Sequence, residues 1–153
     1  MRGVSRVLMV CTGNICRSPT MEAVLRRHAL QAGLDIEFDS AGTESYHVGD
    51  PPDSRSQKVA ALRGYSLAHL RARKVRVPDD FIHFDLILAA DETHLDWLHD
   101  HCPKEHQNKL RLFLGDQALP DPYYGENDAF EDVLTAVEGA AAYWLKTLGA
   151  PKR

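Results

Sequence analysis

The chain has 153 residues, a formal net charge of −4 and 44% hydrophobic residues, an ordinary balance for a globular protein. This length suits one folded unit with a full core, so we expect 1–153 to form a single domain. The acidic balance argues against nucleic acid as a partner. No apolar run reaches the roughly 20 residues that a membrane span needs. The apolar run before Cys11 is also too short for a signal peptide, so we expect a cytoplasmic protein with no membrane partner.

Strand-like and helix-like segments alternate along the chain. In chain order, the pattern predicts a strand over Ser5–Val10, a helix over Pro19–Ala32, a strand over Ile36–Ser40, a loop over Gly42–Pro52, a helix over Ser54–Leu62, a strand over Phe84–Ala90, a helix over Glu92–His101, a strand over Leu110–Leu114, a loop over Leu119–Gly125 and a helix over Asp128–Leu148. The first helix has Ser18 as its predicted N-cap, Pro19 at its first helical position and Gly33 as its stop signal. The alternation predicts an α/β fold with a parallel sheet.

The segment Cys11–Ser18 joins the first predicted strand to the first predicted helix. In an α/β fold this position is an anion site, because free backbone N–H groups and the positive end of the helix dipole meet there. A cysteine in that field is easily deprotonated, since the same donors stabilise its thiolate. Cys11 can therefore act as a nucleophile, while Arg17 can hold two phosphate oxygens at once. Ser18 can donate a hydrogen bond to the thiolate, and a carboxyl group on another loop would complete phosphate-ester chemistry.

Ten residues, from Val10 to Pro19, closely resemble the signature of the low-molecular-weight protein tyrosine phosphatases. Asp121-Pro122-Tyr123-Tyr124-Gly125 resembles the acid loop of the same family, and Asp39–Thr43, Asp53–Arg55 and Phe84–Leu88 resemble further family blocks. The resemblance implies a flavodoxin-like sheet of four parallel strands with helices on both faces and a phosphate-binding loop after the first strand. It implies the hydrolysis of phosphotyrosine, and of aryl phosphates, through a cysteinyl-phosphate intermediate.

The resemblance also implies roles for single residues. It makes Cys11 the nucleophile, Arg17 the phosphate clamp and Asp121 the general acid, with Ser40 supporting the loop from behind. The expected substrate-binding residues are Thr12, Gly13, Asn14, Ile15, Cys16, Ser18, Tyr46, Tyr123 and Tyr124. Asn14 suits a tight loop because asparagine tolerates left-handed backbone geometry, and the tyrosines suit a phosphotyrosine ring. The expected partners are phosphotyrosine-containing proteins and a tyrosine kinase, with no metal or organic cofactor, and the chain is expected to be a monomer.

The chain departs from the family pattern at three places. Met21 stands where the family often has alanine, and Tyr46 stands where it often has tryptophan. His69 lies one residue too far from Ala72-Arg73 to match a histidine that braces the phosphate loop. The sequence therefore leaves the support of that loop undetermined.

Several features have competing interpretations. Cys16 is either a packing residue or a redox partner that forms a disulfide with Cys11. Arsenate reduction on a similar loop is one rival function, but it needs close resolving cysteines, and only Cys102 lies beyond the loop. A non-catalytic phosphotyrosine-binding module is the other rival, although such a protein would be expected to lack Cys11 or Asp121. Four histidines and a basic run are interpreted as solvated surface: His94, His99, His101 and His106, with Arg71, Arg73, Lys74 and Arg76.

Overall fold

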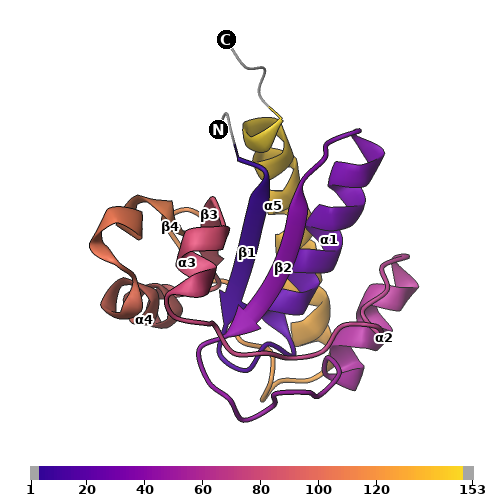
Figure 1. The fold of residues 1–153 in the computed structure, drawn as a ribbon. Helices are drawn as coiled ribbons and strands as arrows, with labels where there is room; N and C mark the ends of the chain where they lie inside the picture. The colour runs from indigo at the N-terminus through magenta and orange to yellow at the C-terminus, as the bar shows by residue number, and fades with distance from the viewer. Residues whose placement is uncertain (1–3, 150–153) are drawn as a thin grey trace.

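In the computed structural model, which describes residues 4–149, the chain forms four parallel strands in one sheet (Figure 1). The strands are β1 (Arg6–Cys11), β2 (Glu37–Gly42), β3 (Leu86–Ala89) and β4 (Leu110–Leu112), in the order β2-β1-β3-β4. This order is that of a flavodoxin-like sheet, and the predicted fold class is confirmed.

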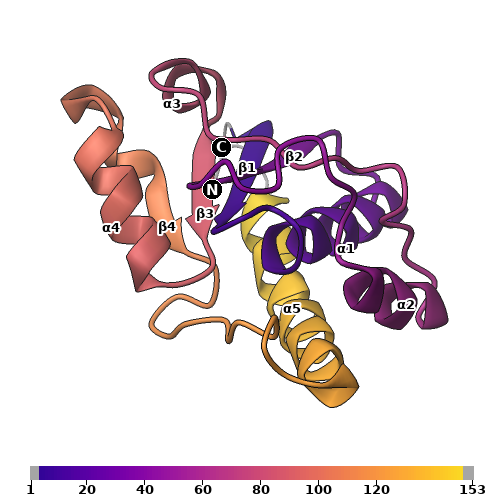
Figure 2. The ribbon, with the colours of Figure 1, turned by 90° about the horizontal axis from the view of Figure 1, so that it is seen from below.

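Helices cover both faces of the sheet (Figure 2). One face packs against α1 (Arg17–Gln31) and α5 (Asn127–Leu148), with α2 (Ser54–Leu62) against α5. The other face packs against α3 (Asp79–His83) and α4 (Glu92–His101). Successive residues of β1 point to opposite faces, so Val7 and Met9 enter the α1 core while Leu8 and Val10 enter the α4 core. A sheet buried on both faces explains why β1 and β3 are apolar without alternation.

The predicted element boundaries match best where capping residues are present. Helices α2 and α4 have the predicted bounds, and each begins directly after an aspartate whose side chain accepts backbone N–H groups. Strand β2 continues two residues beyond its predicted end, while β3 and β4 are shorter than predicted. The sequence analysis missed α3 and the 3-10 helix η1 (Lys104–Lys109), because such short elements carry no helical periodicity.

The start of α1 differs from the prediction. The helix begins at Arg17, and Cys16 occupies the N-cap position without a capping side chain. The assignment of Ser18 as N-cap is therefore wrong: its hydroxyl turns back to Cys11 and Asn14 instead. Pro19 is consequently the third residue of the helix and not its first, but it still lies in the first turn, where backbone N–H groups lack partners within the helix. The predicted stop at Gly33 is confirmed, since this residue has φ +73° just after the helix.

The ends of the strands bring the Cys11 loop into a crevice. Cys11 ends β1, which lies between β2 and β3 at the point where the strand order reverses. Open parallel sheets bind ligands outside the carboxyl ends of their strands at such a point. Gly42 ends β2 beside this loop, where a Cβ atom would lie 2.6 Å from the carbonyl oxygen of Thr12. Among residues 4–149, no helix is long and apolar enough to cross a membrane.

Candidate active site

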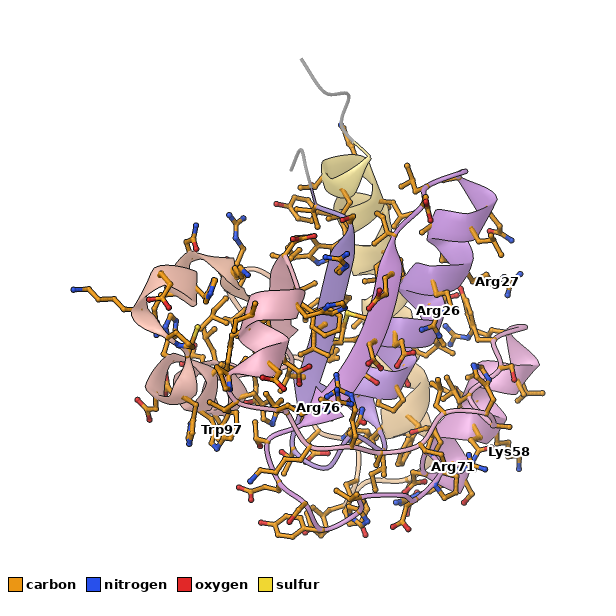
Figure 3. The ribbon with its side chains drawn as sticks, viewed as in Figure 1. Arg26, Arg27, Lys58, Arg71, Arg76 and Trp97 are labelled. Carbon is orange, nitrogen blue, oxygen red and sulfur yellow. The ribbon has the colours of Figure 1, made fainter. Side chains whose placement is uncertain are left out.

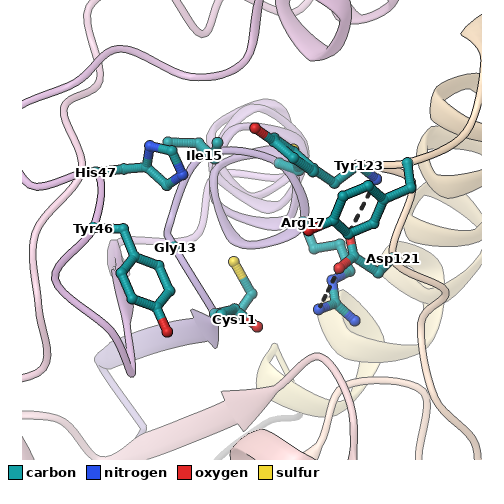
Figure 4. A pocket seen from close by; sticks show the side chains of 11 residues that line it. Cys11, Gly13, Ile15, Arg17, Tyr46, His47, Asp121 and Tyr123 are labelled. Carbon is teal, nitrogen blue, oxygen red and sulfur yellow. Dashed lines mark hydrogen bonds and ion pairs between the residues drawn. The ribbon is translucent and has the colours of Figure 1, made fainter.

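A cavity of about 260 Å³ opens at the carboxyl end of β1, above the N-terminus of α1 (Figure 4). Its lining comes from the phosphate loop (residues 11–18), the loop after β2 and the acid loop (residues 119–125): Cys11, Thr12, Gly13, Ile15, Cys16, Arg17, Tyr46, His47, Asp121, Tyr123 and Tyr124. All of these except His47 were predicted site residues. Of the remaining predicted residues, Asn14 and Ser18 belong to the phosphate loop and Ser40 to β2; all three are buried, and none lines the cavity.

The Cys11 thiol lies at the floor of this cavity with two hydrogen-bond donors beside it. Its Sγ atom is 3.0 Å from Ser18 Oγ, and the Ser18 N–H donates to it at 3.5 Å. The side chain is nearly buried, with 3% of the residue exposed. These donors and the positive end of the α1 dipole all face the Cys11 sulfur, so the floor of the cavity is built as an anion site.

Asn14 fixes the direction of the Ser18 hydrogen bond. Its backbone has φ 60°, so the expected left-handed geometry is confirmed. The Arg73 N–H donates to Asn14 Oδ1 at 3.0 Å, which leaves Asn14 Nδ2 to donate to Ser18 Oγ at 2.8 Å. Because the Ser18 oxygen accepts that bond, its own proton is free to point at Cys11 Sγ. The buried amide thereby sets Ser18 as a donor to the thiol.

A second branch of this network runs into the protein. Asn14 Nδ2 also donates to Ser40 Oγ at 2.9 Å, and Ser40 Oγ donates to Glu22 Oε1. Glu22 is 3% exposed, and its other carboxylate oxygen accepts from Arg26 on the next turn of α1. Ser40 therefore supports the loop from β2, as expected, and Glu22 is a buried anchor that the sequence analysis missed. A glutamate in the first turns of a helix gave no signal that it faces inward.

The structure answers the question raised by His69. This residue is exposed, and among residues 4–149 it makes no hydrogen bond to the phosphate loop. The Arg73 backbone N–H supports Asn14 in its place, and the Arg73 side chain pairs with Asp39 at 3.1 Å and Asp80 at 2.8 Å. Interpreting Arg73 as part of a solvated basic run was therefore wrong. Its neighbours Arg71, Lys74 and Arg76 are exposed, as expected; Arg71 and Arg76 are labelled in Figure 3.

Arg17 is held so that one edge of its guanidinium faces the cavity. Nη1 donates to Asp91 Oδ2 at 2.8 Å and to the Leu119 carbonyl at 2.9 Å, while Nη2 lies 3.8 Å from Asp121 Oδ2. Burial opposes ionisation of Asp91, but the hydrogen bond and charge of Arg17 and the interactions with His94 together outweigh it, so the pKa of Asp91 lies below its usual value. Because Nη1 is held in this way, the remaining N–H groups of the guanidinium keep a set orientation. They are suited to bind two oxygens of one phosphate group.

His94 belongs to the site and not to a solvated histidine cluster. It is 1% exposed, and its Nδ1 accepts the Asp91 N–H at 3.3 Å in a capping box at the start of α4. Its Nε2 therefore donates to Thr12 Oγ1, at 2.7 Å. Burial lowers the pKa of His94 to about 4, so the ring is neutral near pH 7. The interpretation of His94 as solvated was wrong, whereas His99 and His101 are exposed.

Asp121 comes from the acid loop and reaches the same cavity. Its Oδ1 accepts the Tyr123 N–H at 3.1 Å, and its side chain is 47% exposed. The fold brings this carboxyl beside Arg17 although the two lie far apart in the sequence. A carboxyl group over an anion site is placed to exchange a proton with a leaving oxygen or with water.

Aromatic side chains form the rim of the cavity (Figure 4). Tyr46 is 73% exposed and Tyr124 is 93% exposed, while the ring of Tyr123 packs edge-on against Tyr124 at 5.0 Å. His47 lies between the two sides of this rim, 6.4 Å from Tyr46 and 6.5 Å from Tyr123 between ring centroids. The sequence analysis missed His47, and its position next to Tyr46 was the only signal. Its ring lies so close above Gly13 that a Cβ atom there would be 2.8 Å from His47 Cδ2.

The other cysteines occupy different surroundings. Burial, together with the charges of Asp53 and Cys11, raises the pKa of Cys16 to about 12. Cys102 is buried in the α4 core, whereas Cys11 and Cys16 belong to the α1 core. Cys102 therefore lies on the opposite side of the sheet from Cys11, away from the phosphate loop. Among residues 4–149, no three His, Cys, Asp or Glu side chains are placed to hold a metal ion.

Taken together, the fold and the cavity define a class of protein. It is an α/β protein of flavodoxin-like topology whose cavity, between a cysteine, an arginine and a helix N-terminus, is suited to an anion. Comparison with known proteins gives the family. The family model "Low molecular weight phosphotyrosine protein phosphatase" matches residues 6–153. A low molecular weight protein-tyrosine-phosphatase of Streptomyces coelicolor is 44% identical over 147 residues, which cover 89% of this chain and 88% of that protein.

Solved structures agree with this assignment. A protein tyrosine phosphatase of Entamoeba histolytica, with Hepes in its active site, has a TM-score of 0.88 and 38% identity, covering 94% of this chain and 96% of that one. Wzb of Vibrio vulnificus in complex with benzylphosphonate has a TM-score of 0.87 and 30% identity, covering 95% of this chain and all of that one (100%). The chain belongs to the low molecular weight phosphotyrosine protein phosphatases, a family of hydrolases that act on phosphotyrosine through a cysteine nucleophile.

Proposed function

We propose that Cys11 is the nucleophile of a two-step phosphotyrosine hydrolysis. The observation that carries this proposal is that Cys11, Arg17 and Asp121 line one cavity at the N-terminus of α1. The Cys11 thiolate attacks phosphorus, and the bond from phosphorus to the tyrosine oxygen breaks. Arg17 and the N–H groups of the phosphate loop hold the three equatorial oxygens while charge shifts between the attacking and leaving atoms.

Asp121 supplies the proton transfers in both steps. As a carboxylic acid it gives its proton to the departing tyrosine oxygen, which leaves a cysteinyl phosphate and an ionised Asp121. The carboxylate then takes a proton from a water molecule that attacks phosphorus, so inorganic phosphate leaves and the thiolate is restored. Every step uses side chains of this protein and water, so the proposed mechanism requires no metal or organic cofactor.

The substrates that suit this cavity are phosphotyrosine-containing proteins. The rim of Tyr46, Tyr123 and Tyr124 is placed to flank a phenyl ring whose phosphate reaches Cys11 at the floor. The benzylphosphonate bound to the Vibrio vulnificus relative supports this pose, since it joins an aromatic ring to a phosphorus group. We further propose that the chain acts as a monomeric, single-domain phosphatase in the cytoplasm, where a tyrosine kinase that makes its substrates is a partner.

A comparison of matched phosphopeptides tests the substrate class. We expect kcat/KM for a phosphotyrosine peptide to exceed that for the phosphoserine peptide by roughly 100-fold or more, because a phosphate held about an ångström out of place costs that much. Serine carries its phosphate close to the peptide backbone, so the rim would keep it above the thiol. Equal kcat/KM values for the two peptides would contradict a deep pocket selective for tyrosine.

The redox alternative for Cys16 leads to a separate prediction. Peroxide oxidises Cys11 to a sulfenic acid, and the Cys16 thiol then condenses with it to form a disulfide and release water. Oxidation also removes the Cys11 charge that helps to raise the pKa of Cys16. We therefore expect dithiothreitol to restore full activity to peroxide-treated parent protein and to Cys102→Ser, but little activity to Cys16→Ser. Equal recovery in all three proteins, or a peptide map without the Cys11–Cys16 link, would leave Cys16 as a packing residue.

A further inference from the structure

The acid loop is tied down on both sides of Asp121. Before Asp121, the Leu119 N–H donates to the Ala90 carbonyl at 2.8 Å, and the Leu119 carbonyl accepts from Arg17. After Asp121, Arg55 Nη1 donates to the Gly125 carbonyl at 3.3 Å. The first tie belongs to the strand ends and the phosphate clamp. The second comes from α2, whose residues have no part in the mechanism proposed above.

Arg55 is itself held in one orientation. Asp53, the N-cap of α2, accepts from Arg55 Nε at 3.0 Å and from Arg55 Nη2 at 2.9 Å, so the guanidinium is gripped by both carboxylate oxygens. Its carbon Cζ lies 4.4 Å from the ring centre of Phe130 in the first turns of α5 and 5.5 Å from that of Tyr123. A fork-to-fork ion pair with ring contacts on the cation orders an arginine far more than a lone surface ion pair.

The same pair also reaches the phosphate loop. The Asp53 N–H donates to the carbonyl oxygen of Ile15, a residue that lines the cavity, at 2.8 Å. The hydrogen bonds from the Arg55 side chain lower the pKa of Asp53 despite its partial burial, so its carboxylate stays ionised near neutral pH. A continuous set of contacts thus runs from Ile15 through Asp53 and Arg55 to Gly125 and Tyr123.

We propose that Arg55 is a positioning residue. It holds the acid loop at the distance from the phosphate loop at which the Asp121 carboxyl can transfer a proton to the leaving group. This inference rests on the proposed role of Asp121 as general acid. Among residues 4–149, the Asp121 carboxylate accepts one hydrogen bond, from the Tyr123 N–H, and it lies 3.8 Å from Arg17. Its placement therefore depends on the loop, and Tyr123 is the residue that both holds Asp121 and packs on Arg55.

Replacement of Arg55 by methionine tests the proposal, because methionine keeps the apolar stem and removes the fork. The assay is kcat/KM on aryl phosphates that differ only in the leaving group, from phenyl phosphate to 2,4-dinitrophenyl phosphate. A displaced acid slows the leaving groups that need a proton, so we expect about a 10- to 100-fold loss on phenyl phosphate. We expect little change on 2,4-dinitrophenyl phosphate, whose anion leaves unaided.

Arg63→Met is the matched control. Arg63 also pairs with a carboxylate, Glu138 on α5, at 2.6 Å, and its side chain is 34% exposed against 35% for Arg55. Arg63 does not contact the acid loop. We therefore expect Arg63→Met to keep the parent's ratio of kcat/KM on phenyl phosphate to kcat/KM on 2,4-dinitrophenyl phosphate. Inhibition by inorganic phosphate is expected to be unchanged in Arg55→Met, since the phosphate loop keeps its Asp53 backbone contact.

Three outcomes would overturn the proposal: equal losses on both substrates, no loss on either, or the same altered ratio in Arg63→Met. Arg55→Lys gives the test again if the methionine variant does not fold. Lysine keeps the charge but cannot fork between Asp53 and Gly125, so the loss on phenyl phosphate is expected to persist. Failure of the proposed function would give a different result from failure of this inference. The parent protein would then hydrolyse neither substrate, or the loss of kcat/KM in Asp121→Asn would not depend on the leaving group.

Discussion

Cys11→Ala is expected to abolish the hydrolysis of phosphotyrosine and aryl phosphates while the protein stays folded. Without the thiolate no cysteinyl phosphate can form, and removal of a covalent nucleophile costs at least about 10⁴-fold in kcat. Alanine fits the space of the nearly buried side chain, and the Asn14 contacts with Ser18, Ser40 and Arg73 do not involve the cysteine. Steady-state rates with p-nitrophenyl phosphate measure the loss, and thermal unfolding by circular dichroism measures the fold.

Cys102→Ala is the matched control for this variant. It also removes a buried thiol, but from the core on the opposite face of the sheet. We expect its turnover to match the parent, even if the melting temperature falls. A folded Cys11→Ala protein that still hydrolyses aryl phosphates near the parent rate would show that the cysteine is not the nucleophile, and the proposed mechanism would be wrong.

The sequence predicted those parts of the fold that depend on local pattern. The apolar runs located the strands, and the aspartates at positions 53 and 91 cap two helices whose bounds agree with prediction. The cavity lining was predicted almost completely, because most of it lies in two short motifs. The motifs are contiguous in sequence, so recognising them requires no knowledge of long-range contacts.

The errors concern side chains whose partners come from distant elements. Ser18 has the residue type of an N-cap, but Cys11 and Asn14 compete for its hydroxyl. Nothing in the sequence distinguishes His94 from the exposed His99 and His101. Its hydrogen bond to Thr12 joins it to a distant segment of the chain, so a local pattern could not predict it. Arg73 supports the phosphate loop through a backbone N–H, which every residue except proline carries, so no residue type could indicate that role.

Asp121→Asn is expected to slow hydrolysis by about 10²–10⁴-fold for substrates with poor leaving groups, the range that a general acid contributes. Asparagine keeps an oxygen to accept the Tyr123 N–H, so the shape of the acid loop is retained, but it has no proton to give. The loss is therefore expected to be large for phenyl phosphate and small for 2,4-dinitrophenyl phosphate. The dependence of kcat/KM on the leaving group, measured for a series of aryl phosphates, checks this expectation.

Asp116→Asn is the control for this substitution, since Asp116 is an exposed aspartate after β4 that lies outside the cavity. It is expected to leave the leaving-group series unchanged. A uniform loss for Asp121→Asn across the series would indicate that the carboxylate only holds Arg17, which lies 3.8 Å away. In that case the loss of the ion pair would leave Arg17 less well held and would weaken phosphate binding for every substrate alike, and the proton for the tyrosine oxygen would have to come from water. A loss confined to poor leaving groups excludes this alternative, because a binding defect cannot distinguish substrates that share the same phosphate.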